Sequence, residues 1–131
     1  MKKTGVLNHR IAKVIAVMGH GDSLVIGDAG LPIPEEVERI DLAVSRGIPA
    51  LLDVARAVAA ELQVERLVLA DELRERNREL TAAIVDLFPG SELEFVPHEQ
   101  FKQRTRVARA VVRTGEHTPY ANVILVSGVT F

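Results

Sequence analysis

Histidine is the residue type in this chain best suited to moving protons near neutral pH, because its unperturbed pKa is about 6.5. Of the four histidines, His20 has the most suggestive context, since it lies between Gly19 and Gly21 directly after a segment with helical periodicity. The negative end of a helix favours a protonated imidazole, and the flanking glycines leave the ring accessible. His20 is therefore the candidate general acid, with an ordinary surface histidine as the alternative.

The other three histidines give weaker signals. His9 falls in the first turn of an expected helix, and His117 lies in a polar turn, so both are interpreted as surface residues. His98 and Lys102 are four residues apart on an expected short helix. Both side chains should project from one face and could donate hydrogen bonds to one hydroxylated ligand, although chance spacing explains them equally well.

Asp28 is the candidate among the acidic residues. It stands in the Gly-Asp-Ala-Gly loop that directly follows the apolar run 23–26. Open α/β sheets usually bind ligands at the carboxyl ends of their strands, which favours a functional role for Asp28. Capping of the turn by the carboxylate is an equally good explanation.

Several kinds of chemistry are not supported by the sequence. There is no cysteine, and no pair of histidines has the spacing H-x-H, H-x-x-x-H or H-E-x-x-H, so no metal site is expected. No glycine-rich phosphate motif is present, and no serine has a G-x-S-x-G context. The sequence therefore predicts neither a metal, nor a nucleotide cofactor, nor an acyl-enzyme mechanism.

Composition and charge bound the class of partner. The 131 residues carry a net charge of -2, with one tyrosine and no tryptophan, so neither phosphate backbones nor single-stranded bases are expected to bind. No apolar run approaches the roughly 18 residues that span a bilayer. We expect a small neutral ligand, no nucleic acid and no membrane partner. The absence of cysteine suits a cytoplasmic location.

The remaining sequence must supply the elements that position these residues. Helices are expected at 9–18, 50–62, 77–87 and 98–105, with Asn8 and Asn77 as caps of the first and third. Strands are expected at 23–26, 39–44, 65–70, 92–96, 109–113 and 122–127. This alternation predicts one α/β domain over residues 1–131, with a mostly parallel or mixed central sheet flanked by helices.

Two charged clusters are interpreted as solvated surface. Residues 72–79 mix both signs, with Glu72 and Arg76 four apart as on an exposed helical face. The second cluster is basic, and only its first member is considered for a ligand role: Lys102, Arg104, Arg106 and Arg109.

Five segments, taken in order, are similar to the ribose pyranase and fucose mutarotase family. They are residues 2–8 (KKTGVLN), 19–22 (GHGD), 27–32 (GDAGLP), 97–102 (PHEQFK) and 113–122 (RTGEHTPYAN). Each segment alone would be a weak signal, but their joint order and spacing, together with the apolar Phe131, make the resemblance run from end to end. Residues 54–90 fit only by their general pattern.

The resemblance implies a cytoplasmic, cofactor-free isomerase of the mutarotase type. It would convert free ribose between its pyranose and furanose forms, and family members form ring-shaped decamers. The resemblance assigns His20 as the proton donor and six further positions as contacts to the sugar: Asp28, His98, Lys102, Tyr120, Ala121 and Asn122. Two alternatives stay open, namely a non-catalytic sugar-binding accessory of ribose uptake and a fucose mutarotase.

The chemistry of ring opening fits these residue types. His20 would protonate the ring oxygen, oriented or kept charged by Asp28, while another side chain or water accepts the proton of the anomeric hydroxyl. Tyr120 and Asn122 could hydrogen-bond sugar hydroxyls, or could simply cap the turn before the last strand.

An assembly with shared pockets is expected as well. The apolar segment 123–131 should be buried against the core or against a neighbouring subunit. If the pockets lie at subunit boundaries, His20 and Asp28 would come from one chain. Some of the other sugar contacts would then come from the neighbour: His98, Lys102, Tyr120 and Asn122.

Overall fold

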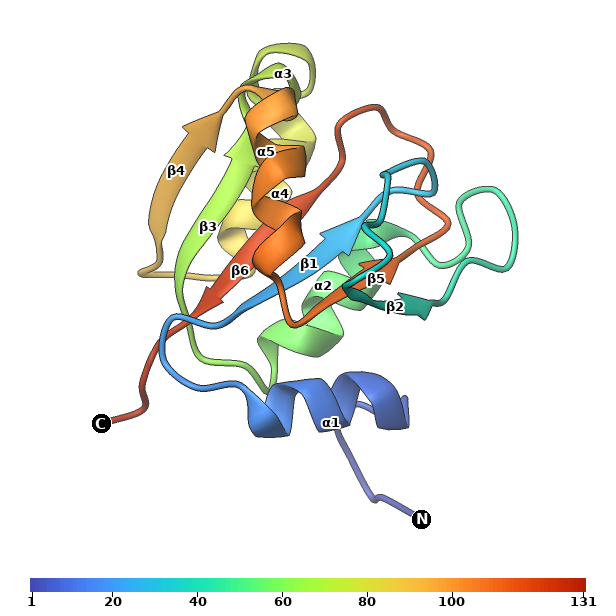
Figure 1. Cartoon of the computed structure of the whole chain (residues 1–131), viewed down its shortest axis with the longest axis vertical. Helices are drawn as coiled ribbons and strands as arrows, with labels where there is room; N and C mark the ends of the chain where they lie inside the picture. Colours follow the sequence, from blue (N-terminus) through green and yellow to red (C-terminus); the bar gives the residue numbers. More distant parts are fainter.

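The computed structural model describes residues 1–131 and places six strands in one mixed sheet (Figure 1). The strands are β1 (Ser23–Gly27), β2 (Glu38–Asp41), β3 (Val64–Ala70), β4 (Glu92–Val96), β5 (Ala110–Arg113) and β6 (Val123–Ser127). Their order across the sheet is β2-β5-β1-β6-β3-β4. Only β6 runs against its neighbours, because it pairs antiparallel with both β1 and β3. The carboxyl ends of the other five strands therefore meet at one edge of the sheet, together with the start of β6.

Helices cover both faces of this sheet. They are α1 (His9–Val17), α2 (Leu51–Ala59), α3 (Asp71–Arg76), α4 (Arg78–Asp86) and α5 (His98–Arg104), followed by the 3-10 turn η1 (Thr105–Val107). The core cluster that includes residues of α1, α2 and α4 is separate from the one to which α5 contributes. This arrangement confirms the predicted α/β architecture with a mixed sheet between helices.

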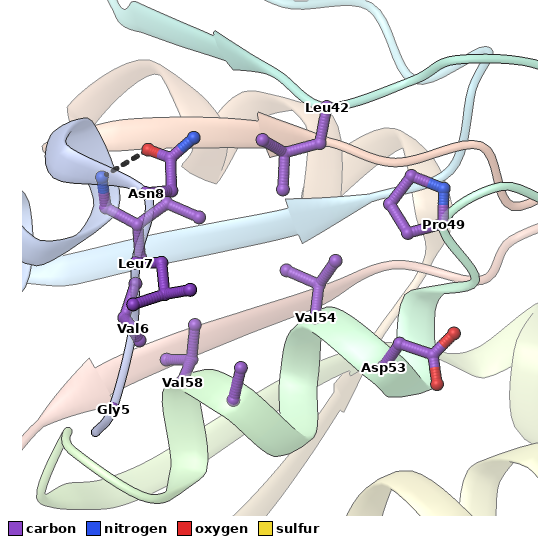
Figure 2. Close-up of a pocket in the computed structure, with 11 residues that line it drawn as sticks. Gly5, Val6, Leu7, Asn8, Leu42, Pro49, Asp53, Val54 and Val58 are labelled. Carbon is purple, nitrogen blue, oxygen red and sulfur yellow. Dashed lines mark hydrogen bonds between the residues drawn. The ribbon is translucent and has the colours of Figure 1, made fainter. Parts of the chain in front are cut away.

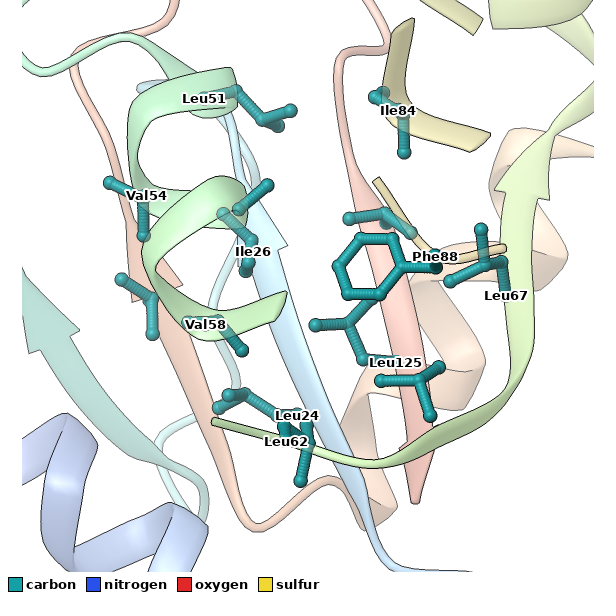
Figure 3. Packing of buried hydrophobic residues seen from close by; sticks show 14 of the residues in the cluster. Leu24, Ile26, Leu51, Val54, Val58, Leu62, Leu67, Ile84, Phe88 and Leu125 are labelled. Atoms are coloured by element: carbon teal, nitrogen blue, oxygen red, sulfur yellow. The ribbon is translucent and has the colours of Figure 1, made fainter. Parts of the chain in front are cut away.

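Alternation along β1 shows why the strand needs cover on both sides. Leu24 and Ile26 belong to the larger cluster with the α2 residues, whereas Val25 belongs to the cluster that α5 covers. Figure 3 shows the larger cluster, with the side chains of α2 lying against β1. Successive side chains of a strand point to opposite faces, so a strand in the middle of a two-sided layer must be apolar throughout.

Phe101 anchors α5 to its face of the sheet. Its side chain is fully buried and packs in the cluster with Val25, Val68 and Ile124. Truncating a buried phenylalanine to alanine typically costs about 3–5 kcal/mol. α5 is therefore held firmly, and with it the residues that begin this helix.

The helix caps predicted from the sequence are present. Asn8 Oδ1 accepts hydrogen bonds from the amides of Arg10 and Ile11, both at 3.0 Å. Asn77 Oδ1 accepts from the amide of Leu80 at 2.9 Å. Such caps satisfy donors that would otherwise have no partner in the first turn.

The strand predicted at 39–44 is shorter than expected. It ends at Asp41 because its pairing partner β5 ends at Arg113, opposite Asp41. The Asp41 carboxylate then accepts a hydrogen bond from the Ala43 amide at 3.1 Å, which turns the chain away from the sheet. Alternation of polar and apolar residues continues past this point, so it could not reveal the end of the ladder.

Both edge strands carry charged residues. β2 pairs only with β5 and contains Glu38, Arg39 and Asp41, while β4 pairs only with β3 and contains Glu92 and Glu94. Charged side chains on an edge strand oppose pairing with a second sheet. Neither edge of the sheet is therefore suited to extension by a further strand.

Candidate active site

Asp28 and Asn122 form a closed pair at the carboxyl edge of the sheet. Asp28 follows β1 and Asn122 precedes β6, and these two strands are antiparallel neighbours. Asn122 Oδ1 accepts from the Asp28 amide at 2.8 Å, and Asn122 Nδ2 donates to Asp28 Oδ2 at 3.0 Å. Asp28 Oδ1 also accepts from the Gly30 amide at 2.9 Å, so the carboxylate does cap its turn. Because each carboxylate oxygen has two lone pairs, both can still accept a hydrogen bond from a ligand.

Tyr120 and His98 meet beside this pair. The two rings lie edge to face, with centroids 5.0 Å apart and an interplanar angle of 78°. Tyr120 has φ 63, which places a non-glycine residue in the left-handed region. That conformation costs about 1–2 kcal/mol, and such strain is typical of functional sites. His98 Nδ1 is buried without a hydrogen-bond partner, so the site holds an unused polar atom.

The charged segment of α3 holds both aromatic residues in place. Both carboxylate oxygens of Glu72 accept from the His98 amide, at 2.9 and 3.2 Å, and so cap the start of α5. The guanidinium carbon of Arg76 lies 5.1 Å from the centroid of the Tyr120 ring, within cation-π range. The expectation of a purely solvated face is therefore wrong for Glu72. Arg76 is exposed, but it lies over the ring of Tyr120, a candidate site residue.

Lys102 lies one turn beyond His98 on α5. Its Nζ contacts Glu99 Oε1 at 2.6 Å, and the hydrogen bond from Lys102 lowers the pKa of the Glu99 carboxyl. The rest of the basic cluster is also paired with carboxylates, as expected of solvated surface: Arg104 with Glu94, Arg106 with Glu36 and Arg109 with Asp22. Ala121 is fully buried within the single chain.

A polar depression of about 420 Å³ opens next to Asp28, lined also by Arg113, Glu116 and His117. Partial burial disfavours the charged form of Glu116, but hydrogen bonds from Thr118, Leu51 and His117 outweigh it and lower the pKa of its carboxyl. Glu116 thus ties this loop to the start of α2 through the Leu51 amide, at 3.2 Å. His117 Nδ1 lies 2.8 Å from the Gly115 carbonyl oxygen, in keeping with its interpretation as a turn residue.

A second hollow, between the N-terminal segment and α2, has a different character (Figure 2). Its volume is about 310 Å³, and Val6, Leu42, Val54 and Val58 are among the residues that line it. Ligands rich in hydroxyl groups need several convergent polar partners, which this apolar groove does not offer. The depression at the carboxyl edge is the better candidate for a polar ligand.

His20 lies at the opposite edge of the sheet. Its turn connects α1 to β1, and the Gly21 amide donates to the carbonyl oxygen of Ser127, at the end of β6, at 2.9 Å. The five residues of β1 separate His20 from Asp28, and at about 3.3 Å per residue this strand alone spans about 17 Å. Figure 1 shows the turn before β1 beside the end of β6, away from the tips of β1 and β3.

The ring of His20 contacts Glu65, whereas Asp28 was the expected partner. His20 Nε2 lies 2.8 Å from Glu65 Oε2, and the two side chains are 60% and 39% exposed. The idea that Asp28 orients His20 within one chain is therefore wrong, because a strand separates the two residues. Glu65 was missed because the sequence marks it only as part of a strand.

Asp22 fixes the turn that carries His20. Its carboxylate accepts from the Gly19 amide at 2.8 Å and pairs with Arg109 at 3.0 Å. The hydrogen bond from Gly19, followed by that from Arg109, lowers the pKa of the Asp22 carboxyl. The Ser127 hydroxyl donates to the Gly19 carbonyl and ties the same turn to β6.

The chain therefore has two separate groups of candidate residues. Asp28, His98, Tyr120 and Asn122 lie together at the carboxyl edge, with Lys102 one turn along α5, and His20 with Glu65 lies at the amino edge. No group of three or more His, Asp or Glu side chains is placed to hold a metal ion. None of the helices is both long and apolar enough to traverse a bilayer.

Comparison with known proteins gives one consistent family. The sequence profile of the RbsD / FucU transport protein family matches residues 1–130. A D-ribose pyranase from Chloroflexus aggregans is 56% identical over 131 residues, the full length of both chains. One from Laribacter hongkongensis is 53% identical over the same full length.

Solved structures agree with this result. The structure of Bacillus subtilis RbsD complexed with D-ribose matches with a TM-score of 0.96 at 48% identity, over the whole of both chains. A fucose mutarotase from Streptococcus pneumoniae, solved in complex with L-fucose, matches with a TM-score of 0.70 at 22% identity. That match covers 95% of this chain and 94% of the other, and it shows a shared fold.

Proposed function

The chain belongs to the RbsD / FucU transport protein family, and from this premise we propose that it interconverts the pyranose and furanose forms of free D-ribose. The observation that carries the proposal is the full-length similarity to RbsD complexed with D-ribose, combined with a polar cluster at the carboxyl edge of the same fold. Relatives more than half identical over their full length are D-ribose pyranases. We place the activity in the cytoplasm, acting on ribose after uptake.

The reaction needs one acid and one base and no redox step. As the C1–O5 bond of the pyranose breaks, its electron pair goes to the ring oxygen, which takes a proton from the acid. The anomeric hydroxyl gives its proton to the base, and its O–H electron pair forms the carbonyl. Addition of the 4-hydroxyl to this carbonyl then closes the furanose. Acid-base assistance of this type typically contributes about 10² to 10⁴ in rate.

The carboxyl-edge residues have the groups to hold a sugar. The Asp28 carboxylate can accept from sugar hydroxyls, and the unpartnered His98 Nδ1 is a further polar contact. The Tyr120 ring can pack on an apolar face of the sugar, and its hydroxyl can donate. Asn122, Lys102 and the backbone of Ala121 complete the proposed set, as the family resemblance implies.

His20 is the proposed acid, and a second copy of the chain must bring it to the sugar. One chain holds the binding cluster and His20 at opposite edges of the sheet. The grouping expected from the sequence is therefore revised: Asp28 belongs with His98, Tyr120 and Asn122, while His20 comes from the neighbour.

A homo-oligomer follows from this arrangement, and the family resemblance suggests a ring-shaped decamer. Exposed apolar residues near the amino edge support contact with a neighbour, since Val129 and Phe131 are exposed although β6 itself is buried. Burial of the whole segment 123–131 against the chain's own core is thus not observed. The charged edge strands direct this contact away from sheet extension.

Magnetisation-transfer NMR of ribose tests the proposal. Catalytic amounts of the protein should accelerate exchange between pyranose and furanose signals, and His20→Ala should remove most of the acceleration while ribose still binds. Ribose binding without acceleration by the unaltered protein would instead support a non-catalytic accessory of uptake. Faster exchange of L-fucose than of ribose would support a fucose mutarotase.

A further inference from the structure

We infer that Glu65 is the positioning residue for His20 and that it makes Nδ1 the ring nitrogen that exchanges a proton with the sugar. The inference rests on the proposed function, because it assigns a geometry to the proposed acid. Its basis is the 2.8 Å contact between His20 Nε2 and Glu65 Oε2, together with the way β3 presents Glu65.

Glu65 is the extra residue of a β-bulge. The pairing of β3 with β6 aligns Val64 with Ser127 but Arg66 with Val126, so the register shifts across Glu65. Val64 and Leu67 belong to the same core cluster although they are three apart, which regular alternation would not allow. Bulges are frequent beside active sites, where they redirect a side chain. Here the bulge releases Glu65 from the alternation of β3 and lets it reach the turn that carries His20.

The neighbouring segment leaves room for this side chain. A Cβ added at Gly128 would lie 3.0 Å from Glu65 Cβ, closer than side chains normally pack. The Gly128 amide donates to the Gln63 carbonyl oxygen at 2.9 Å and so holds the end of β6 beside the bulge. The β-bulge, the space left by Gly128 and the contact with His20 thus all concern the side chain of Glu65.

The chemistry of a carboxylate decides which nitrogen reacts. An ionised carboxylate can only accept hydrogen bonds, so its partner Nε2 must carry a proton in both the neutral and the charged ring. The proton that His20 gains and loses is then the one on Nδ1, which Glu65 does not touch. The nearby Asp22 is engaged by Gly19 and Arg109 and leaves this role to Glu65.

The His20–Glu65 pair is expected to contribute little to the stability of the fold. Both side chains are more than one third exposed in the single chain, and exposed ion pairs contribute little to folding. A neighbouring copy that covers this edge would remove water from the pair and strengthen it. Positioning of His20 at the shared site therefore explains the pair better than folding does.

Two variants test the role of Glu65 in turnover. Glu65→Ala should lower kcat about tenfold with little change in KM. A tenfold loss is part of the about 10² to 10⁴ in rate that acid-base catalysis contributes. Glu65→Gln keeps the volume and removes the charge, so its kcat should fall between that of Glu65→Ala and the unaltered protein. Glu36→Ala is the matched control. It also removes an exposed carboxylate that is paired with a basic residue, Arg106 at 3.3 Å, and it should leave kcat unchanged.

The tautomer of His20 is the second readout. In the unaltered protein, ¹⁵N spectra of the neutral ring should show the proton on Nε2, and Glu65→Ala should shift the ring toward a mixture of tautomers. Unchanged kcat in both Glu65 variants, with His20→Ala inactive, would overturn the positioning role and leave the proposed function standing. A neutral ring protonated on Nδ1 would overturn the assigned nitrogen. Absence of exchange catalysis in the unaltered protein would instead contradict the proposed function.

Discussion

Mixing two inactive variants should restore activity if sites form between the two edges of neighbouring chains. His20→Ala removes the proposed acid from the amino edge, and His98→Ala removes a sugar contact from the carboxyl edge. Neither variant alone can form an intact site. A mixed oligomer can, wherever the carboxyl edge of a His20→Ala chain meets the amino edge of a His98→Ala chain.

The size of the recovery follows from the two-edge geometry. With equal amounts and random exchange, half of the chains supply an intact carboxyl edge and the other half an intact amino edge. About one quarter of the sites should then be intact, whether the chains meet head to tail or about a twofold axis. Because loss of the acid removes about 10² to 10⁴ in rate, the mixture should exceed the His20→Ala variant by at least twentyfold.

Magnetisation-transfer NMR gives the assay, with native mass spectrometry to confirm subunit exchange. Asp28→Ala provides the sharpest control, because Asp28 shares the carboxyl edge with His98. It should complement His20→Ala but fail to complement His98→Ala. Complementation between Asp28→Ala and His98→Ala would refute the grouping by edges, and no recovery in any mixture after proven exchange would refute shared sites.

Four further predictions concern the binding edge and the absence of a cofactor. Asn122→Ala should weaken ribose binding and cost about 1–3 kcal/mol of unfolding free energy, measured by chemical denaturation, because it leaves the half-buried amide and carboxylate of Asp28 without these partners. Glu72→Ala should raise KM and lower stability by about 1 kcal/mol through loss of the α5 cap, while unchanged KM would argue against a role in positioning His98. The pKa of Glu116 is lowered in the folded chain, so its carboxylate stabilises the fold at pH values above 4.5, the ordinary pKa of a glutamate. This contribution is lost as the pH falls through the pKa of the folded state. The stability of Glu116→Gln, measured by denaturation, should therefore depend less on acid pH. Prolonged chelation should leave activity intact, and loss that one added metal restores would overturn the cofactor-free mechanism.

Structural features that depend on residues close together in the sequence were predictable. The caps at Asn8 and Asn77 depend on a side chain and amides two or three residues away, and both are present. Strand positions depend on runs of apolar residues, and β4 was predicted with its actual bounds. The direction of β6 was not predictable, because the same apolar run fits a parallel or an antiparallel neighbour.

The organisation of the site depends on relations that local patterns do not contain. Asp28 and His20 are eight residues apart, but the strand between them places them at opposite edges. The role of Glu65 depends on the register of β3 against β6, which no pattern within β3 reveals. Glu72 looked like the partner of Arg76 on one helical face, whereas its carboxylate caps a helix that begins 26 residues later.

With the proposed roles of His20 and Asp28, the division of the chain into two edges would make assembly a condition of catalysis. The carboxyl edge has the hydrogen-bonding groups proposed to hold the sugar, but its histidine packs against Tyr120 and its carboxylate is hydrogen-bonded to Asn122. The amino edge has an exposed histidine whose Nε2 contacts the Glu65 carboxylate, but few groups to hold a ligand. Each edge thus lacks what the other supplies. In the proposed assembly, the carboxyl edge of one chain would bind the sugar and the amino edge of its neighbour would exchange protons with it.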